Sequence, residues 1–162
     1  MKNRLLLVFS LLTFFSFGQK SVEFHSITEL NQDTSAYKVI LVSAPWCGIC
    51  KTNHEMIENS ETIFDTASSS VTFFEMENDY TEAIEFDNKT FHFIQRGLSV
   101  GEHQIIEYLV ESGEAVYPTF VLLNGENQKI GTYRGFVNES DWLEIFGTIL
   151  NHLASPDSVT SN

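Results

Sequence analysis

The sequence predicts an α/β fold with a mixed central sheet and helices on both faces. Residues 38–43 form an apolar, β-branched run that is typical of a central strand covered on both sides. A helical stretch and a second strand pattern over 71–76 follow, so strand, helix and strand alternate. Asn124-Gly125 separates two later strand patterns, and a last helical stretch closes the chain. This order of elements indicates a mixed sheet between two helical layers.

The remaining elements of the first half are short. Ser26 and Glu29 have the spacing of a capping box, which predicts a short helix through about Asp33. We also expect a strand over 22–24 and helices over 48–58 and 61–66.

The segment 77–116 is less regular. Strand patterns over 83–86 and 90–94 predict a hairpin around residues 87–89. Ser99 and Glu102 have the capping-box spacing, which predicts a helix that Gly113 ends.

The last part of the chain predicts a hairpin and a helix. Asn124-Gly125 favours a two-residue type I′ turn, with a return strand over 128–133. Asn138 is a suitable cap for the final helix. We expect one domain over 19–154 and a polar, flexible tail over 155–162.

The N-terminus has the pattern of a secretory signal peptide. Lys2 and Arg4 precede an apolar run over 5–15, and small residues end the segment at Gly18. The run is too short to span a bilayer as a helix. We therefore expect a signal peptide over 1–18, cleavage before Gln19, a periplasmic or secreted protein, and no membrane insertion after cleavage.

The charge of the mature chain disfavours nucleic acid as a partner. Without Lys2 and Arg4, the nine basic residues fall to seven against 22 acidic ones, which gives a net charge of −15. Such a surface repels nucleic acid and anionic membranes.

Both cysteines lie in the pentapeptide Trp46-Cys47-Gly48-Ile49-Cys50, directly after the central strand. The first thiol then stands at a helix N-terminus, where the helix dipole and free N–H groups favour a thiolate. In an oxidising compartment the pair is expected as a disulfide. A bridge across two residues restrains the chain very little, so the pair suits redox exchange better than structural stabilisation.

Three segments carry a resemblance to a known family. Residues 44–51 resemble the thioredoxin active-site motif, with Gly48-Ile49 in place of the usual Gly-Pro. Residues 117–120 look like the cis-proline segment of that family, and Gly135 matches a family glycine. The segment 77–116 is similar to an insertion before the cis-proline in secreted, Bacteroidota-type thioredoxin-related proteins. The resemblance implies a thioredoxin fold with a hairpin–helix insertion.

The resemblance also implies roles at the site. Cys47 would attack a substrate disulfide, and Cys50 would resolve the mixed disulfide. Pro118 would be cis and face the thiols. Together with Trp46 and Tyr117, it would bind substrate. The supporting residues would be Gly48, Ile49 and Thr119. The implied partners are protein disulfide substrates and a redox partner protein, and no bound cofactor is implied.

Two departures concern the direction of electron flow. Leu41 stands where thioredoxins carry a buried aspartate, six residues before the first cysteine. The dipeptide Gly48-Ile49 matches none of the well-known oxidant, isomerase or reductase pairs. We favour a reductase, because the motif is nearest to that of thioredoxin outside its two variable positions, Gly48 and Ile49.

Two other functions remain as alternatives. His54 follows Cys50 by four residues and lies on the same helical face, so Cys47, Cys50 and His54 could hold a metal in a binding or delivery module. The chain could also be a non-catalytic interaction domain that binds through residues 77–116.

Overall fold

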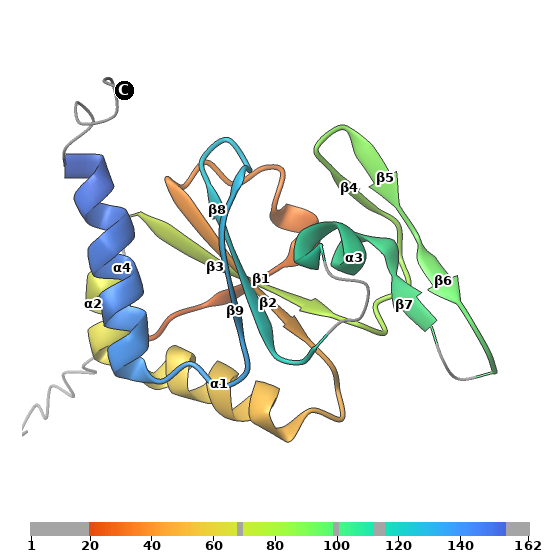
Figure 1. Cartoon of the computed structure of the whole chain (residues 1–162), viewed down its shortest axis with the longest axis horizontal. Coiled ribbons are helices and arrows are strands. Elements are labelled where there is room, and N and C mark those ends of the chain that lie inside the picture. The colour runs from red at the N-terminus through yellow and green to blue at the C-terminus, as the bar shows by residue number, and fades with distance from the viewer. Residues whose placement is uncertain (1–19, 68–69, 99–100, 112–115, 155–162) are drawn as a thin grey trace, which may run out of the picture.

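The centre of the protein is a mixed five-stranded sheet (Figure 1). The computed structural model describes residues 20–67, 70–98, 101–111 and 116–154, with side chains through residue 151. The strand order is β1-β3-β2-β8-β9, with the bounds β1 Phe24–Ser26, β2 Tyr37–Ser43, β3 Val71–Glu77, β8 Thr119–Asn124 and β9 Lys129–Arg134. The strand β2 pairs in parallel with β3 and antiparallel with β8, which confirms the predicted mixed sheet.

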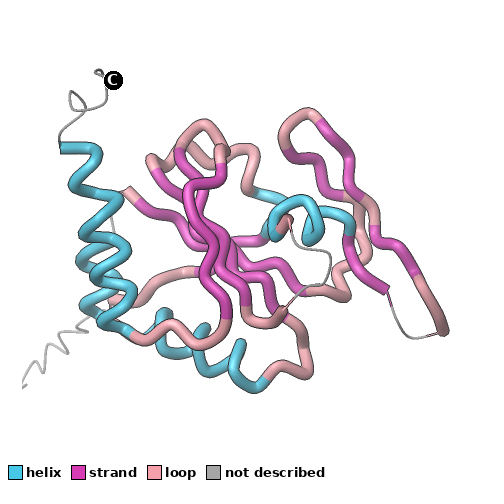
Figure 2. Tube along the Cα trace, in the orientation of Figure 1, coloured by secondary structure: helices cyan, strands magenta, loops and turns pink. Residues whose placement is uncertain are grey.

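Helices cover both faces of the sheet, as the sequence predicts (Figures 1 and 2). One face carries α1 (Gly48–Asn59), α2 (Glu61–Ala67) and α4 (Glu139–Ala154), and its core contains Ile57 and Trp142. The other face carries the 3-10 helix η1 (Ile27–Glu29) and α3 (Gln104–Val110). Successive β2 side chains alternate between these two cores, because neighbouring residues of a strand point to opposite faces.

Two small hairpins follow β3 and precede α3 in the sequence, and they lie on the α3 side of the sheet (Figure 1). They are β4 (Ile84–Phe86) with β5 (Lys89–Phe91), and β6 (Phe93–Gln95) with β7 (Gly101–His103). Asp87 and Asn88 both have positive φ, 51° and 57°, which a two-residue hairpin turn requires. The hairpin expected around residues 87–89 is therefore confirmed.

The predicted start and end of α3 are wrong. His103, not Ser99, is the N-cap of α3, because its side chain accepts a hydrogen bond from the Ile105 N–H. The helix ends at Val110, and its C-cap Glu111 adopts the left-handed conformation with φ 53°. Ser99 and Gly113 lie outside the described residues. This boundary could not be predicted from the sequence, because an imidazole rarely fills the capping role.

The turn after β8 also differs from the prediction. The loop is longer than two residues, and Asn127 rather than Gly125 has positive φ, at 61°. The Asn124 carboxamide oxygen accepts hydrogen bonds from the Glu126 and Gln128 N–H groups. The polar side chain of Asn124 therefore organises the turn, where the prediction relied on a glycine.

The N-terminal elements are shifted or shorter than expected. The first strand is β1 at Phe24–Ser26 instead of 22–24, because it pairs in register with Phe73 to Glu75 of β3. The capping box between Ser26 and Glu29 is confirmed, but it opens a 3-10 helix of three residues instead of a helix through Asp33. The predicted signal peptide and the C-terminal tail lie outside the described residues. None of the helices described is long and apolar enough to cross a membrane.

Candidate redox site

The cysteine motif lies at the junction between β2 and α1. The Cys47 N–H donates to the Ala44 carbonyl (2.9 Å), and this turn leads directly into α1. Cys47 is the N-cap of α1, and its Sγ accepts a hydrogen bond from the Cys50 N–H at 3.1 Å. The sulfur therefore takes the position that an oxygen occupies at most helix N-termini, where negative charge is stabilised.

Cys47 and Cys50 form a disulfide with a Cα–Cα distance of 5.2 Å. Both residues are buried, with Cys50 (3% exposed) more enclosed than Cys47 (8%). The order of burial agrees with the sequence, which placed Cys50 one turn further into the helix. Cys47 is therefore the more accessible of the two cysteines.

The Tyr117–Pro118 loop faces the motif. The Tyr117–Pro118 peptide bond is cis, and Tyr117 packs against the small cluster of Ala44, Cys47 and Cys50. The Pro118 carbonyl accepts from the Gly135 N–H (2.9 Å), and Gly135 has a φ of +82°, which favours glycine. The fold thus brings together two segments that are about seventy residues apart in the sequence.

Thr119 supports the loop from inside. It is buried, and its hydroxyl donates to the Val116 carbonyl at 2.6 Å.

Gly48 and Ile49 form the start of α1, where a Cβ on Gly48 would meet no atom within 4 Å. Space around residue 48 therefore does not demand a glycine.

Apolar side chains surround the disulfide on the surface. Trp46 is 74% exposed and meets the Tyr117 ring edge-on at a centroid distance of 5.8 Å. Ile49, in the motif, and Val116, beside the cis peptide, are also exposed. Clustered exposed apolar groups mark sites for protein or ligand contact.

Tyr117 connects the site to the α3 side of the sheet. Its hydroxyl donates to Glu102 Oε1 at 3.3 Å. Burial of the ring, together with the negative charge of Glu102, raises the pKa of Tyr117 to about 12. The phenol therefore stays a hydrogen-bond donor throughout the physiological range.

A polar cluster, His54, Glu75 and Ser43, lies beneath α1. His54 Nε2 is 3.3 Å from Glu75 Oε2, and the Ser43 hydroxyl donates to Glu75 Oε1 at 2.8 Å. The hydrogen bond with Glu75 raises the pKa of His54, although burial opposes it. Burial alone would raise the pKa of Glu75, but its hydrogen bonds with His54 and Ser43 bring the pKa below its usual value.

From the sequence we expected His54 to be a surface histidine, with a metal ligand as the alternative, and Glu75 was not identified. The sequence signal that could have found Glu75 is its charge, which stands out in the apolar strand pattern of 71–76. Within the described ranges, no group of three or more His, Cys, Asp or Glu residues is placed to hold a metal ion. Of the alternative set, Cys47 and Cys50 are joined in a disulfide and His54 faces Glu75.

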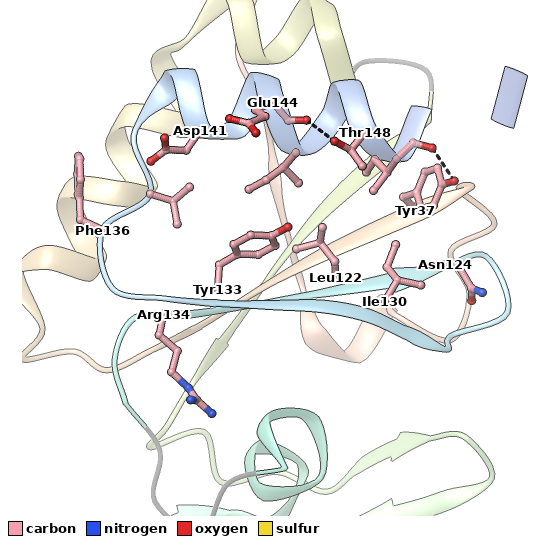
Figure 3. Close-up of a pocket in the computed structure, with 13 residues that line it drawn as sticks. Tyr37, Leu122, Asn124, Ile130, Tyr133, Arg134, Phe136, Asp141, Glu144 and Thr148 are labelled. Atoms are coloured by element: carbon pink, nitrogen blue, oxygen red, sulfur yellow. Dashed lines mark hydrogen bonds between the residues drawn. The ribbon is translucent and has the colours of Figure 1, made fainter. Parts of the chain in front are cut away.

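A separate groove of about 780 Å³ opens between β9 and α4 (Figure 3). Its walls include Tyr133 of β9 and Thr148 of α4. No residue of the motif or of the Tyr117–Thr119 loop lines it. The groove is thus distinct from the disulfide site.

The chain is similar to solved structures of thioredoxin-fold proteins. A thioredoxin-fold protein from Helicobacter pylori superposes with a TM-score of 0.58 at 12% identity, over 89% of this chain and 83% of that chain. Chloroplastic thioredoxin z superposes with a TM-score of 0.51 at 15% identity, over 81% of this chain and 96% of that chain. No protein-family model and no curated protein sequence matches the chain. The protein therefore has a thioredoxin fold, as the motif resemblance implies.

Proposed function

We propose that this protein is a thiol–disulfide oxidoreductase that exchanges disulfides with protein substrates through Cys47 and Cys50. The observation that carries the proposal is the hydrogen bond from the Cys50 N–H to Cys47 Sγ at the start of α1. In the reduced protein the same N–H group would stabilise a Cys47 thiolate, which is the nucleophilic form of cysteine. A thiol whose pKa falls from ~8.5 to ~7 changes from about 3% to about half ionised at neutral pH.

The reaction consists of two exchanges. The Cys47 thiolate attacks one sulfur of a substrate disulfide, the substrate S–S bond breaks, and the second substrate sulfur leaves as a thiolate. Cys50 then loses its proton and attacks Cys47 Sγ, which forms the Cys47–Cys50 disulfide and releases the first substrate sulfur. Two electrons pass to the substrate, and its two sulfurs take up the two protons. A dithiol of a redox partner protein restores the reduced pair.

Apolar contacts around the disulfide suit an extended protein segment. Trp46 and Tyr117 would hold side chains next to the scissile disulfide, and the backbone beside Pro118 would pair with the segment as an added strand. Gly48, Ile49 and Thr119 would support this surface. The packing of Tyr117 on the cysteine cluster and the exposure of Trp46 favour these roles.

The proposal includes export and a direction of electron flow. The signal pattern over 1–18 supports a periplasmic or secreted protein of the Bacteroidota type, in which residues 77–116 are an insertion. The likeness of the motif to that of thioredoxin supports a reductase. Equilibration with a glutathione buffer measures the reduction potential of the Cys47–Cys50 disulfide. We expect a value nearer ~−270 mV than ~−120 mV.

Insulin reduction by dithiothreitol tests the activity. The wild-type protein should accelerate the precipitation of the insulin B chain, and the Cys47→Ser variant should leave the uncatalysed rate unchanged. A second assay tests the opposite direction of electron flow. It measures how fast the disulfide form of the protein oxidises a reduced peptide dithiol. If wild type and Cys47→Ser are equal in both assays, the protein is not an oxidoreductase of this kind.

A further inference from the structure

The His54–Glu75 pair lies on the same face of the sheet as the buried end of the cysteine motif. Leu41 and Glu75 are partners in the parallel β2–β3 register, so their side chains point to the same face. Leu41 packs in the core that contains Ile57 of α1. The Glu75 carboxylate is therefore directed toward the underside of α1, where it meets His54.

Cys50 and His54 are one helical turn apart in α1. Residues four apart on a helix have Cβ atoms roughly 5–6 Å from each other. Cys50 is 3% exposed, while the side chains of His54 and Glu75 are 28% and 29% exposed. The imidazole–carboxylate pair thus lies one helical turn from Cys50, and both of its side chains have access to solvent.

A buried thiol holds its proton more tightly than an exposed one, because burial disfavours the thiolate. Cys50 nevertheless has to ionise before it can attack Cys47 in the mixed disulfide. We propose that the His54–Glu75 pair accepts the proton of Cys50 during resolution, while Ser43 holds the carboxylate in place. This inference rests on the proposed redox function and adds a second pair of residues to it.

The proton and the electrons balance within this step. The Cys50 S–H bond breaks and its proton passes to the His54–Glu75 pair. The electron pair left on the Cys50 sulfur forms the bond to Cys47 Sγ. The bond between Cys47 and the substrate then breaks, and the substrate sulfur leaves as a thiolate. The pair then returns its proton, through solvent, to the leaving sulfur.

The negative charges around His54 favour a proton on the imidazole–carboxylate pair. Glu75 of β3 raises the pKa of His54, and Glu58 and Glu55 of α1 act in the same direction. The Phe24 ring of β1 stacks on the imidazole at 4.1 Å and contributes no charge. Glu77 of β3 is a further nearby carboxylate.

Rapid mixing of the reduced protein with dithiobis(nitrobenzoate) tests the inference. The first coloured thiolate is released when Cys47 attacks, and the second is released when Cys50 resolves the mixed disulfide. The Cys50→Ser variant, which gives the first release alone, assigns the two phases. We expect His54→Gln and Glu75→Gln to slow the second phase at least about tenfold at neutral pH, and to leave the first within about twofold. The double variant should be no slower than either single one, because the residues act as a unit.

The pH profile separates proton transfer from a structural role. In wild type the second phase should rise with pH through the ionisation of His54, and this rise should be absent from His54→Gln. His25→Gln is the matched control. His25 of β1 also pairs with a glutamate, Glu29 of η1, but this pair is not on α1. Thermal unfolding of each oxidised variant shows that it is folded.

The outcomes separate the two proposals. An unchanged second phase in folded His54→Gln and Glu75→Gln variants overturns the inference and leaves the redox function intact. A wild-type protein that shows no first phase overturns the redox function itself.

Discussion

Two histidines on opposite faces of the sheet are held in opposite ways. His54, under α1, has its Nε2 3.3 Å from the Glu75 carboxylate, and this contact raises its pKa. His103, at the start of α3, is fully buried, and burial lowers its pKa. Its Nδ1 accepts the Ile105 N–H at 3.3 Å, so its Nε2–H donates to the Glu82 carbonyl at 2.9 Å.

The difference shows how partners decide what a histidine can do. A carboxylate partner stabilises the charged ring, so the pKa of His54 is raised and its protonated form is favoured. A backbone N–H and a backbone carbonyl fix His103 as one neutral tautomer. The α1 face thus carries a group suited to chemistry, and the α3 face carries a group suited to structure.

Among the changes to the two histidines, substitution of His103 should have the largest effect, and this effect is on the free energy of unfolding. His103→Ala removes a fully buried ring and the N-cap of α3. We expect a loss of about 2–4 kcal/mol in the free energy of unfolding, against about 1 kcal/mol for His54→Gln. Urea titration of the two oxidised variants measures both values. Equal losses would mean that the two rings do not differ in their structural roles.

The dependence of stability on pH sharpens the same contrast. The pKa of His54 is raised in the folded state, so its contribution is full below about pH 6.5 and is lost as pH rises through the folded pKa. The pKa of His103 is lowered, so its contribution is full above about pH 6.5 and is lost as pH falls toward the folded pKa.

Urea titrations at several pH values measure this effect. Between about pH 8 and pH 6, the stability difference between wild type and His54→Gln should grow, and the difference for His103→Gln should shrink. Parallel trends in the two variants would contradict the assignment of the two protonation states.

The smallest effect is expected at the contact that links the α3 side to the redox site. Tyr117→Phe removes the hydrogen bond to Glu102 and keeps the ring that packs on the cysteines. The free energy of unfolding should fall by about 1 kcal/mol, and Cys47 alkylation in the reduced protein should stay within about twofold of wild type. A large loss of Cys47 reactivity would instead show that the Tyr117 hydroxyl controls the thiol.

The sequence predicts the elements whose signals are local and strong. The run that became β2, the helix after the cysteines and the Asn138-capped α4 follow from apolar patterns and capping residues. The cysteine motif and the Pro118 segment could be identified because each is contiguous in the sequence.

The missed features depend on contacts between distant residues or on unusual capping. The start of α3 depends on a buried imidazole that takes the place of a hydroxyl or carboxylate. The His54–Glu75 pair arises from the register between β2 and β3 and from the face that α1 covers, which a linear pattern does not encode. The turn at Asn124 follows its side-chain hydrogen bonds rather than the glycine beside it.

Trapping on Cys47 tests the central claim most directly. Reduced Cys50→Ser protein is mixed with an excess of a peptide disulfide, quenched with acid and weighed by mass spectrometry. The account predicts one peptide linked to Cys47, and prompt release of that peptide when the same experiment uses wild type. The redox function is contradicted if Cys50→Ser protein forms no peptide adduct, or if it forms the adduct no faster than unfolded Cys50→Ser protein. Either result would mean that Cys47 is not an activated nucleophile.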